Sequence, residues 1–287
     1  MNIRHLFLFP LLVCFVIFTS CSNEELASKH FTSKILEEQN ILDISYGNNS
    51  QQKFDLYLPA NRDINSTKTL ILVHGGAWIQ GDKEDMNYLI PILKQQFPTY
   101  AIANINYRLA DIENHAFPMQ LDDLNAVIVK LKKENYGISN QYGFIGSSAG
   151  AHLSMLYSYN YNTKKEIKMV ASVVGPTNLT DLNYTTNEQW LRYYYPLTGV
   201  NYEGNEEYFK SLSPYHTATS SSPPTILFYG NNDPLIPVTQ GQDMHLKLNE
   251  LGVYNEFTIY EGGHGTWSQN DIIDSYNKLV RFIKNKF

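Results

Sequence analysis

The chain has 287 residues, of which 43% are hydrophobic and 17% are charged, and this is enough apolar material for the core of one large domain or two small ones. The same composition excludes a chain that is disordered throughout. The formal net charge is −6, from 22 basic and 28 acidic residues. This balance argues against a nucleic-acid binder, because binding to phosphates requires clustered lysine and arginine.

Residues 1–20 are expected to be a lipoprotein signal peptide. Arg4 and His5 precede an uncharged run, Leu6–Phe18, which is too short to cross about 30 Å of hydrocarbon as a helix but has the length of a signal core. The small residues before Cys21 resemble the end of a bacterial lipoprotein signal, in which the cysteine receives the lipid. We therefore expect an anchor at Cys21 in the cell envelope, at the outer membrane or cell surface. Ordinary cleavage, giving a secreted or periplasmic protein, is the alternative.

Residues 21–39 are polar and predict a tether between the lipid and a folded domain at residues 40–287. The sequence contains two cysteines, Cys14 and Cys21. If cleavage falls before Cys21, the mature domain has no other thiol. It could then form neither an internal disulfide nor a cysteine-based metal site.

Strand-like and helix-like segments alternate through this domain. The first two strands, Ile41–Tyr46 and Lys53–Leu58, alternate polar and apolar residues as an antiparallel edge does, whereas the later ones are apolar runs typical of buried parallel strands. The later strands are expected at Lys68–Val73, Tyr100–Tyr107, Tyr142–Ile145, Met169–Val174, Thr225–Tyr229 and Tyr254–Tyr260. Helical apolar stripes occur at Met119–Asn135, Met244–Leu251 and Asp271–Ile283. This order predicts an α/β domain with an eight-stranded, mostly parallel sheet and helices on both faces.

Residues 178–216 interrupt the alternation, and we expect them to form a cap-like insertion over the C-terminal edge of the sheet. The insertion is rich in Tyr and Asn and includes the rings of Trp190, Tyr193, Tyr194, Tyr195 and Tyr202. Such rings can stack on a sugar or an aromatic acyl group, or pack the insertion's own core. Both interpretations remain open.

The segment Gly146–Gly150 has the form of a nucleophile elbow. It follows the strand Tyr142–Ile145 and precedes the apolar stretch Ala151–Tyr157, which is the strand–turn–helix context that such an elbow requires. Glycines two before and two after the nucleophile allow the backbone to pack closely, and Ser148 occupies the central position. Ser148 is therefore the candidate nucleophile.

The segment His74–Trp78 follows the third predicted strand and contains two adjacent glycines. Acyl transfer places negative charge on a carbonyl oxygen, and backbone N–H donors must already point at it. Gly75 and Gly76, together with Ala149 after the nucleophile, are the oxyanion-hole candidates. His74 is expected to orient the loop rather than to catalyse, and Trp78 to line the substrate pocket or to pack under the loop.

Asp233 and His264 follow the last two predicted strands. A serine needs an adjacent base, and a histidine base needs a carboxylate that fixes its tautomer. The chain order Ser148, Asp233, His264 is that of the α/β-hydrolases. Asp243 and Asp271 are competitors for the carboxylate, but they fall within or at the start of predicted helices.

The other histidines of the domain do not predict a metal site. His115, His152, His216 and His245 lack the i, i+4 pair with a third acidic ligand that zinc sites use. We therefore expect neither a metal nor another cofactor.

Together these motifs resemble the α/β-hydrolase superfamily, in particular its esterase/lipase branch, with its bacterial feruloyl- and acetyl-esterase-like proteins and its arylformamidases. The resemblance covers about residues 40–287 and rests on the segments His74–Trp78, Gly81–Lys83, Tyr107–Leu109, Phe117–Pro118, Asp122–Asp123, Gly146–Leu153, Asn232–Asp233 and Gly263–His264. It implies the α/β-hydrolase fold and hydrolysis of carboxylic esters, often small acyl or aromatic esters on plant polysaccharides.

The resemblance also has implications for Ala77 and Arg108. Ala77 replaces the third glycine of lipase-like relatives, which fits the esterase-like and formamidase-like members better. An arginine after the fourth strand can pair in this superfamily with an acid of the next helix, so Arg108 is expected to pair with Asp122 or Asp123 and to brace the loop beside Ser148.

The leading hypothesis is a serine esterase that forms an acyl-enzyme intermediate on a small-molecule or oligosaccharide ester, with acetyl or feruloyl esters of polysaccharide as candidate substrates. One alternative is an amidohydrolase, similar to arylformamidases, or a peptidase on the same fold. A second alternative is a non-catalytic binding lipoprotein. The ordered set Ser148, Asp233 and His264 argues against it, because binding alone needs no such order.

Overall fold

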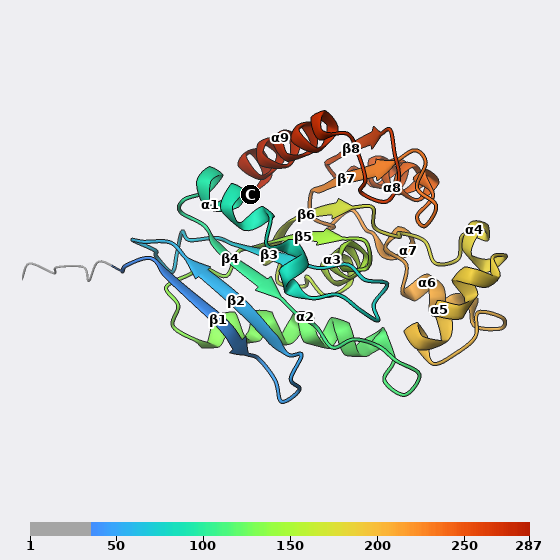
Figure 1. The fold of residues 1–287 in the computed structure, drawn as a ribbon, viewed down its shortest axis with the longest axis horizontal. Helices are drawn as coiled ribbons and strands as arrows, with labels where there is room; N and C mark the ends of the chain where they lie inside the picture. The colour runs from blue at the N-terminus through green and yellow to red at the C-terminus, as the bar shows by residue number, and fades with distance from the viewer. Residues whose placement is uncertain (1–35) are drawn as a thin grey trace, which may run out of the picture. The chain divides into compact units, whose positions relative to one another are not determined.

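The computed structural model describes residues 36–287, which Figure 1 shows in colour. The expectations for the signal peptide, for lipidation at Cys21 and for most of the polar tether lie outside the described residues. Within residues 36–287, no helix has both the length and the apolar character that crossing a bilayer requires.

The domain is built around an eight-stranded sheet with the order β1-β2-β4-β3-β5-β6-β7-β8. β2 pairs antiparallel with both β1 and β4, and all other neighbouring pairs are parallel. The strands are β1 (Gln39–Ser45), β2 (Lys53–Leu58), β3 (Thr69–Val73), β4 (Ala101–Ile105), β5 (Tyr142–Ser147), β6 (Ile167–Val173), β7 (Thr225–Gly230) and β8 (Asn255–Tyr260). The predicted mostly parallel sheet with an antiparallel edge is therefore confirmed.

The burial of the strands explains their sequence patterns. Every residue of β3, β4 and β7 is buried, because other elements cover both faces of the sheet there, and these strands are consequently mostly apolar. β1 lies at the edge, and none of its residues is buried. Only Ile41 and Ile44 of β1 pack against the core, which accounts for its weaker pattern.

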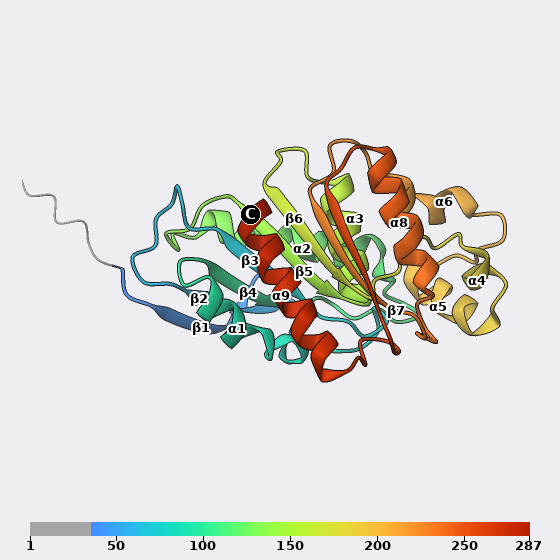
Figure 2. The same cartoon turned by 90° about the horizontal axis from the view of Figure 1, so that it is seen from above.

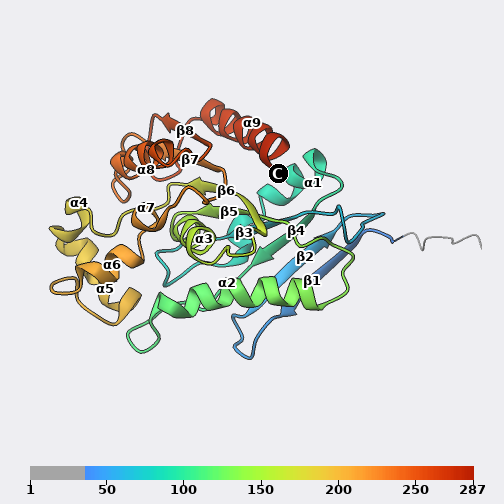
Figure 3. The same cartoon turned by 180° about the vertical axis from the view of Figure 1, so that it is seen from behind.

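Helices cover both faces of the sheet, as predicted. On one face, α2 (Ala116–Lys133), α3 (Ala149–Asn160) and α8 (Val238–Glu250) share a core with the strands, and Figure 3 shows α2 and α3 on this side. On the other face, α1 (Leu89–Gln96) and α9 (Gln269–Lys286) form a second core cluster with the sheet. Figure 2 shows α9 crossing this face.

Two helical features differ from the sequence prediction. The helix α1 was not predicted, because Pro91 interrupts its apolar pattern. Pro91 is the third residue of α1, where its missing N–H has no intrahelical partner to lose, so the helix tolerates it. The helix α8 begins at Val238 rather than at Met244, because its first turn lacks the apolar stripe that marks its later part.

The chain between β6 and β7 forms four short helices: α4 (Leu182–Thr185), α5 (Glu188–Thr198), α6 (Glu206–Ser211) and α7 (Pro214–Thr217). Figure 2 shows α4, α5 and α6 grouped at the end of the sheet toward which the parallel strands point. We refer to residues 178–216 as the cap. The cap therefore lies beside the edge at which the motif residues of β3, β5, β7 and β8 emerge.

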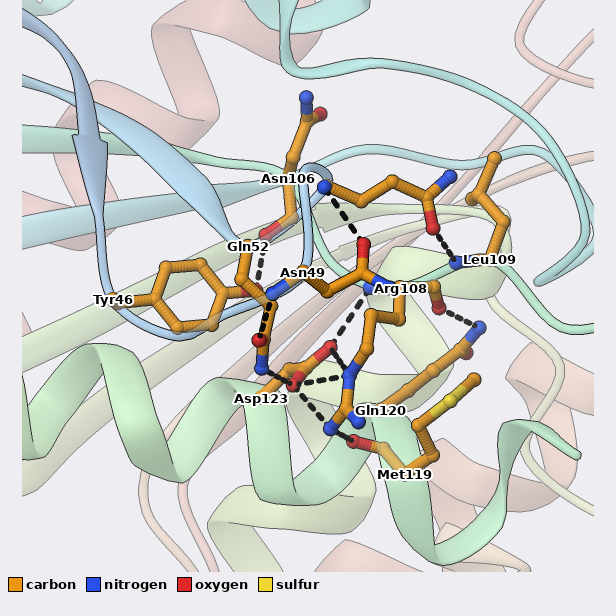
Figure 4. A network of polar contacts seen from close by, with 10 residues as sticks. Tyr46, Asn49, Gln52, Asn106, Arg108, Leu109, Met119, Gln120 and Asp123 are labelled. Carbon is orange, nitrogen blue, oxygen red and sulfur yellow. Dashed lines mark hydrogen bonds and ion pairs between the residues drawn. The ribbon is translucent and has the colours of Figure 1, made fainter. Parts of the chain in front are cut away.

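A buried carboxylate on α2 joins the antiparallel edge to the loop that follows β4 (Figure 4). The side chain of Asp123 is fully buried and accepts hydrogen bonds from the Arg108 guanidinium, with contacts of 2.6 to 3.0 Å, and from the backbone N–H of Arg108 at 2.8 Å. The Gln52 amide, from the turn between β1 and β2, donates to the same carboxylate at 2.8 Å. Asp122 is exposed, and the hydrogen bonds of Arg108 to a carboxylate all go to Asp123, so Asp123 is the partner of Arg108.

The same helix reaches the loop that carries the two adjacent glycines. The Gln120 amide donates to the carbonyl of Arg108 at 2.8 Å and to the carbonyl of Trp78 at 2.7 Å. Gln120 is fully buried, and Trp78 is 1% exposed. The loops after β3 and β4 are therefore fixed to one another through α2.

We predict that Asp123→Asn lowers the free energy of unfolding by about 3 kcal/mol, because it removes one partner of a largely buried ion pair and leaves the Arg108 charge poorly solvated. Urea denaturation followed by circular dichroism measures this value. Asp122→Asn is the matched control, and its effect should stay within about 0.5 kcal/mol because the side chain is exposed. Equal effects of the two substitutions would contradict the role of Asp123 as the buried partner of Arg108.

Candidate active site

Ser148 lies at a sharp turn between β5 and α3. Its backbone has φ 49° and ψ −119°, a conformation that non-glycine residues rarely adopt, and its N–H donates to the carbonyl of Val173 on β6 at 2.8 Å. The turn ends the strand and presents the Ser148 side chain at the edge of the sheet. Ser148 is thus placed where the sequence predicted it.

Close backbone contacts hold this turn. A Cβ atom on Gly146 would lie 2.5 Å from the carbonyl oxygen of Gly150, and a Cβ atom on Gly150 would lie 2.2 Å from the carbonyl oxygen of His74. Any side chain at either position would overlap backbone atoms of the elbow or of the loop after β3. The two glycines are therefore a steric condition for the turn.

The structure brings the other two predicted residues to Ser148. His264 Nε2 lies 2.9 Å from Ser148 Oγ, and His264 Nδ1 lies 2.7 Å from Asp233 Oδ2. Because a carboxylate only accepts, Nδ1 carries the proton and Nε2 is left to accept from the serine hydroxyl. The Asp233 side chain is fully buried, and its other oxygen accepts from the N–H groups of Leu235 and Ile236 at 2.8 and 3.0 Å. The competitors Asp243 and Asp271 have no contact with His264.

The loops that carry Asp233 and His264 are joined by their backbones. The N–H of Asn232 donates to the carbonyl of Gly262 at 2.9 Å, and the N–H of Gly262 donates to the Asn231 side chain at 3.0 Å. These bonds fix the spacing of the two loops beyond the paired strands β7 and β8. The distance between the carboxylate and the imidazole therefore depends on rigid parts of the sheet.

The oxyanion-hole candidates surround the same point. Gly75 approaches the elbow closely, since a Cβ atom on it would lie 3.2 Å from Ser148 Cβ. Ala149 begins α3, so its N–H has no acceptor within the helix. Among the described residues, no acceptor takes the N–H groups of Gly75, Gly76 or Ala149. These donors are therefore available to a ligand beside Ser148.

His74 and Trp78 support the loop between them. His74 Nδ1 lies 2.7 Å from the carbonyl oxygen of Gly75, and its ring stacks on Tyr107 with centroids 4.2 Å apart. Burial lowers the pKa of His74, so the ring is neutral near pH 7. Trp78 is 1% exposed, and its ring meets that of His152 edge to face at 5.3 Å, yet it also lines the cavity described next. Trp78 therefore combines both roles that the sequence left open.

A cavity of about 760 Å³ opens in front of Ser148 and His264. Its lining comes from the loop after β3, from the cap and from the segment after Asp233. The lining residues include Gly75, Gly76, Trp78, Asp85, Ser147, Ser148, Asn187, Trp190, Arg192, Tyr193, Leu235, Ile236 and His264. Its volume is in the range of small-molecule sites, so a substrate larger than a simple acetate ester fits there.

Four of the five cap rings divide between the two roles considered from the sequence. The fifth, Tyr195, is 46% exposed, and its ring meets that of His115 edge to face. Trp190 and Tyr193 line the cavity. Tyr194 is 1% exposed and stacks on Phe209 at 4.6 Å, and Tyr202 packs against the same ring, so these residues form the cap's own core. The sequence could not separate the two groups, because consecutive side chains of α5 point about 100° apart and the sequence does not show which direction faces the cavity.

Gln240 on α8 attaches the start of the cap to the domain, and no sequence pattern marks it. Its side-chain carbonyl accepts from the N–H groups of Thr177 and Asn178, both at 2.8 Å, and its amide donates to Asp181 at 2.6 Å. Arg192, Asp85, Leu235 and Ile236 were also missed as cavity residues. A polar residue on a helix or an apolar pair after a turn has no distinctive spacing, so no signal marked them.

Within the described residues, no group of three or more His, Cys, Asp and Glu side chains is placed to hold a metal ion. The arrangement around Ser148 suits nucleophilic chemistry: a hydroxyl contacts a base, a buried carboxylate orients the base, and backbone N–H donors without acceptors lie nearby.

Comparison with known proteins finds a family model and relatives that are named esterases. Residues 54–248 match the family model described as BD-FAE. The chain is similar to the esterase LipC of Mycobacterium tuberculosis, with 25% identity over 72% of this chain and 55% of that protein. It is also similar to the isoprenylcysteine alpha-carbonyl methylesterase ICME of Arabidopsis thaliana, with 26% identity over 88% of this chain and 61% of that protein. The chain thus spans less than two thirds of the length of either relative.

Among solved structures, a truncated form of a carbohydrate esterase from gut microbiota superposes on the domain with a TM-score of 0.69. The identity is 18%, and the match covers 87% of this chain and 99% of that one. Together with the strand order, this likeness confirms the α/β-hydrolase fold predicted from the sequence.

One turn after Ser148, His152 provides a test of the packing beneath the site. It is fully buried, and its Nε2 donates to the carbonyl of Leu212 in the cap at 2.8 Å. Burial lowers its pKa to about 4, so the folded protein keeps it neutral where the unfolded chain, with a value of about 6.5, takes up a proton. Stability contributed by this residue is therefore lost as the pH falls from about 6.5 to about 4.

We predict that, between pH 7.5 and pH 5, the wild-type protein loses about 2 kcal/mol more of its free energy of unfolding than the His152→Gln variant does. Glutamine keeps a donor for Leu212 but does not titrate. Urea denaturation at both pH values measures the difference. Parallel pH dependences of the two proteins would contradict the buried neutral state.

Proposed function

The chain belongs to the BD-FAE family, and on that premise we propose that it is a serine hydrolase that cleaves carboxylic esters. The observation that carries the proposal is the continuous set of contacts from Ser148 Oγ through His264 to the buried Asp233, with distances of 2.9 and 2.7 Å. The names of the relatives, an esterase and a methylesterase, agree with this class of reaction.

In the proposed mechanism, Ser148 Oγ attacks the ester carbonyl carbon while His264 Nε2 takes the hydroxyl proton. The carbonyl oxygen becomes an oxyanion and accepts from the N–H groups of Gly75 or Gly76 and of Ala149. The C–O bond to the alcohol then breaks, and His264 gives its proton to the leaving oxygen. This leaves an acyl group on Ser148.

Water completes the cycle. His264 removes a proton from a water molecule as its oxygen attacks the acyl carbon, and the oxyanion donors act again. The bond to Ser148 Oγ breaks, His264 returns the proton to the serine, and the carboxylic acid leaves. Asp233 keeps the Nδ1 proton in place throughout, so the imidazole presents the correct nitrogen at each step. The reaction as written uses no cofactor.

An acylated carbohydrate is the substrate class that the cavity supports best. Trp190 and Tyr193 offer ring faces on which a sugar can stack. Asn187 and Arg192 from the cap, and Asp85 from the segment after β3, supply polar groups to the same cavity. Trp78 closes the side beside the two glycines. A carbohydrate esterase among the structural neighbours agrees with this choice.

The amidohydrolase alternative uses the same residues, because a formamide carbonyl presents the same reaction to Ser148. Parallel kcat/KM measurements on acetylated xylo-oligosaccharides and on N-formylkynurenine separate the two. A non-catalytic binding protein would hydrolyse neither.

We also propose that Cys21 carries a lipid and holds the enzyme at the cell envelope. The support is the order of charged, apolar and small residues before Cys21 in the sequence. Such an anchor would keep the domain near polymeric substrates at the cell surface.

We predict that Ser148→Ala lowers kcat for p-nitrophenyl acetate on the order of 10⁴- to 10⁶-fold, because the nucleophile is lost while the fold is kept. Ser158→Ala, at the far end of the same helix, is the matched control and should keep wild-type activity. Ser158 is buried, and its hydroxyl has no partner within the described residues. Undiminished turnover by the Ser148→Ala variant would refute the assignment.

For the anchor, we predict that the full chain expressed in a lipoprotein-processing bacterium incorporates labelled palmitate and partitions into the Triton X-114 detergent phase. Cys21→Ser should abolish both properties, whereas Cys14→Ser, within the signal core, should retain them. Labelling of the Cys21→Ser variant at the wild-type level would overturn the proposal.

A further inference from the structure

A second cavity, of about 380 Å³, lies on the other side of the sheet edge. It lies between the sheet, the segment around α1 and the first half of α9, and Figure 2 shows α1 and α9 side by side on this face. Its lining is Met86, Tyr88, Leu89, Ile145, Ser147, Val173, Phe228, His264, Gly265, Trp267, Ile272, Ser275, Tyr276 and Leu279. We call it the α9 pocket, and the cavity under the cap the cap cavity.

The α9 pocket and the cap cavity share two lining residues beside the reacting atoms, and we call this place the junction. Ser147 and His264 line both of them. His264 Nε2 is the atom that contacts Ser148 Oγ, so a bond cleaved at Ser148 lies at the junction. The oxyanion candidates Gly75 and Gly76 line the cap cavity. A substrate attacked at this junction can thus extend in two directions.

The two cavities differ in chemistry. The α9 pocket contains no Asp, Glu, Lys or Arg in its lining. Its walls are mainly aliphatic and aromatic side chains, many of them from the second core cluster, and the hydroxyl groups of Ser147 and Ser275 lie among them. The cap cavity contains Asp85 and Arg192 together with Asn187 and two rings. Burial of an apolar group is favourable in the first, whereas polar hydroxyl groups find partners in the second.

We propose that the α9 pocket binds the acyl group of the ester substrate, an uncharged aliphatic chain or aromatic ring, while the alcohol part occupies the cap cavity. This inference rests on the proposed ester hydrolysis at Ser148. An acetyl group adds only one methyl group beyond the reacting carbonyl and would leave most of the pocket empty. The preferred acyl group is therefore larger than acetyl.

The expected specificity follows from apolar burial. Each methylene group that enters an apolar pocket raises kcat/KM by about fourfold, so methyl hexanoate should exceed methyl acetate by at least about tenfold. Pentyl acetate is an isomer of methyl hexanoate that places the same hydrocarbon on the alcohol side. Its kcat/KM should therefore be raised little by the α9 pocket.

Ile272 offers a way to fill the pocket without disturbing the triad. It lies in the first turn of α9, is half-buried and lines the pocket, whereas its neighbour Ile273 is 50% exposed and does not line it. Ile272→Trp should lower kcat/KM for methyl hexanoate at least about tenfold and change that for pentyl acetate less than about threefold. Ile273→Trp, the matched control, should leave both values unchanged.

The esters are assayed by pH-stat titration, and circular dichroism with urea denaturation verifies that each variant is folded. If Ile272→Trp unfolds the protein, Ile272→Phe fills the same space with a smaller ring. The ratio of kcat/KM for methyl hexanoate to that for pentyl acetate is then measured on this variant. A selective loss of methyl hexanoate hydrolysis supports the assignment. A selective loss of pentyl acetate hydrolysis, equal losses, or no change in folded protein would overturn it. Failure of the wild-type protein to hydrolyse any ester would contradict the proposed function itself, a result distinct from these.

Discussion

The turn from β5 into α3 leaves no room for a side chain two residues before or two residues after Ser148. Gly146 lies against the carbonyl of Gly150, and Gly150 lies against the carbonyl of His74. These contacts hold Ser148 at φ 49° and tie the elbow to the loop after β3. The position of the hydroxyl and the position of the candidate oxyanion donors therefore come from one packed piece of backbone, and the remaining parts of the site are arranged around it.

Support for this piece extends outward on both sides. On one side, Gln120 and Asp123 of α2 hold the loops after β3 and β4 through the carbonyl of Trp78 and through Arg108. On the other side, backbone bonds between the loops after β7 and β8 hold the carboxylate and the imidazole. The cap is attached through Gln240 of α8 and through His152 of α3. The reacting residues and the cap that lines the cavity are thus held by different contacts. This is consistent with a fold in which the same chemistry serves different substrates.

The parts of this account that were predictable from the sequence depend on local patterns. Apolar runs marked the strands, and the glycines around Ser148, the pair Gly75 and Gly76, and the strand-end positions of Asp233 and His264 identified the candidate residues, which the structure brings together. What could not be predicted depends on packing between distant segments: the choice of Asp123 over Asp122, the division of the cap rings, and the α9 pocket. The helix α1 could not be predicted because Pro91 lies in its first turn. A proline is tolerated there, but in a sequence it resembles a helix break.

The most direct test of the central claim is mass spectrometry of the protein after reaction with a fluorophosphonate, which forms a covalent bond only with an activated serine. The account predicts one adduct per molecule, on the peptide that contains Ser148, and labelling that slows by orders of magnitude when His264 is replaced by alanine. No adduct, an adduct on a different serine, or undiminished labelling without His264 would contradict it.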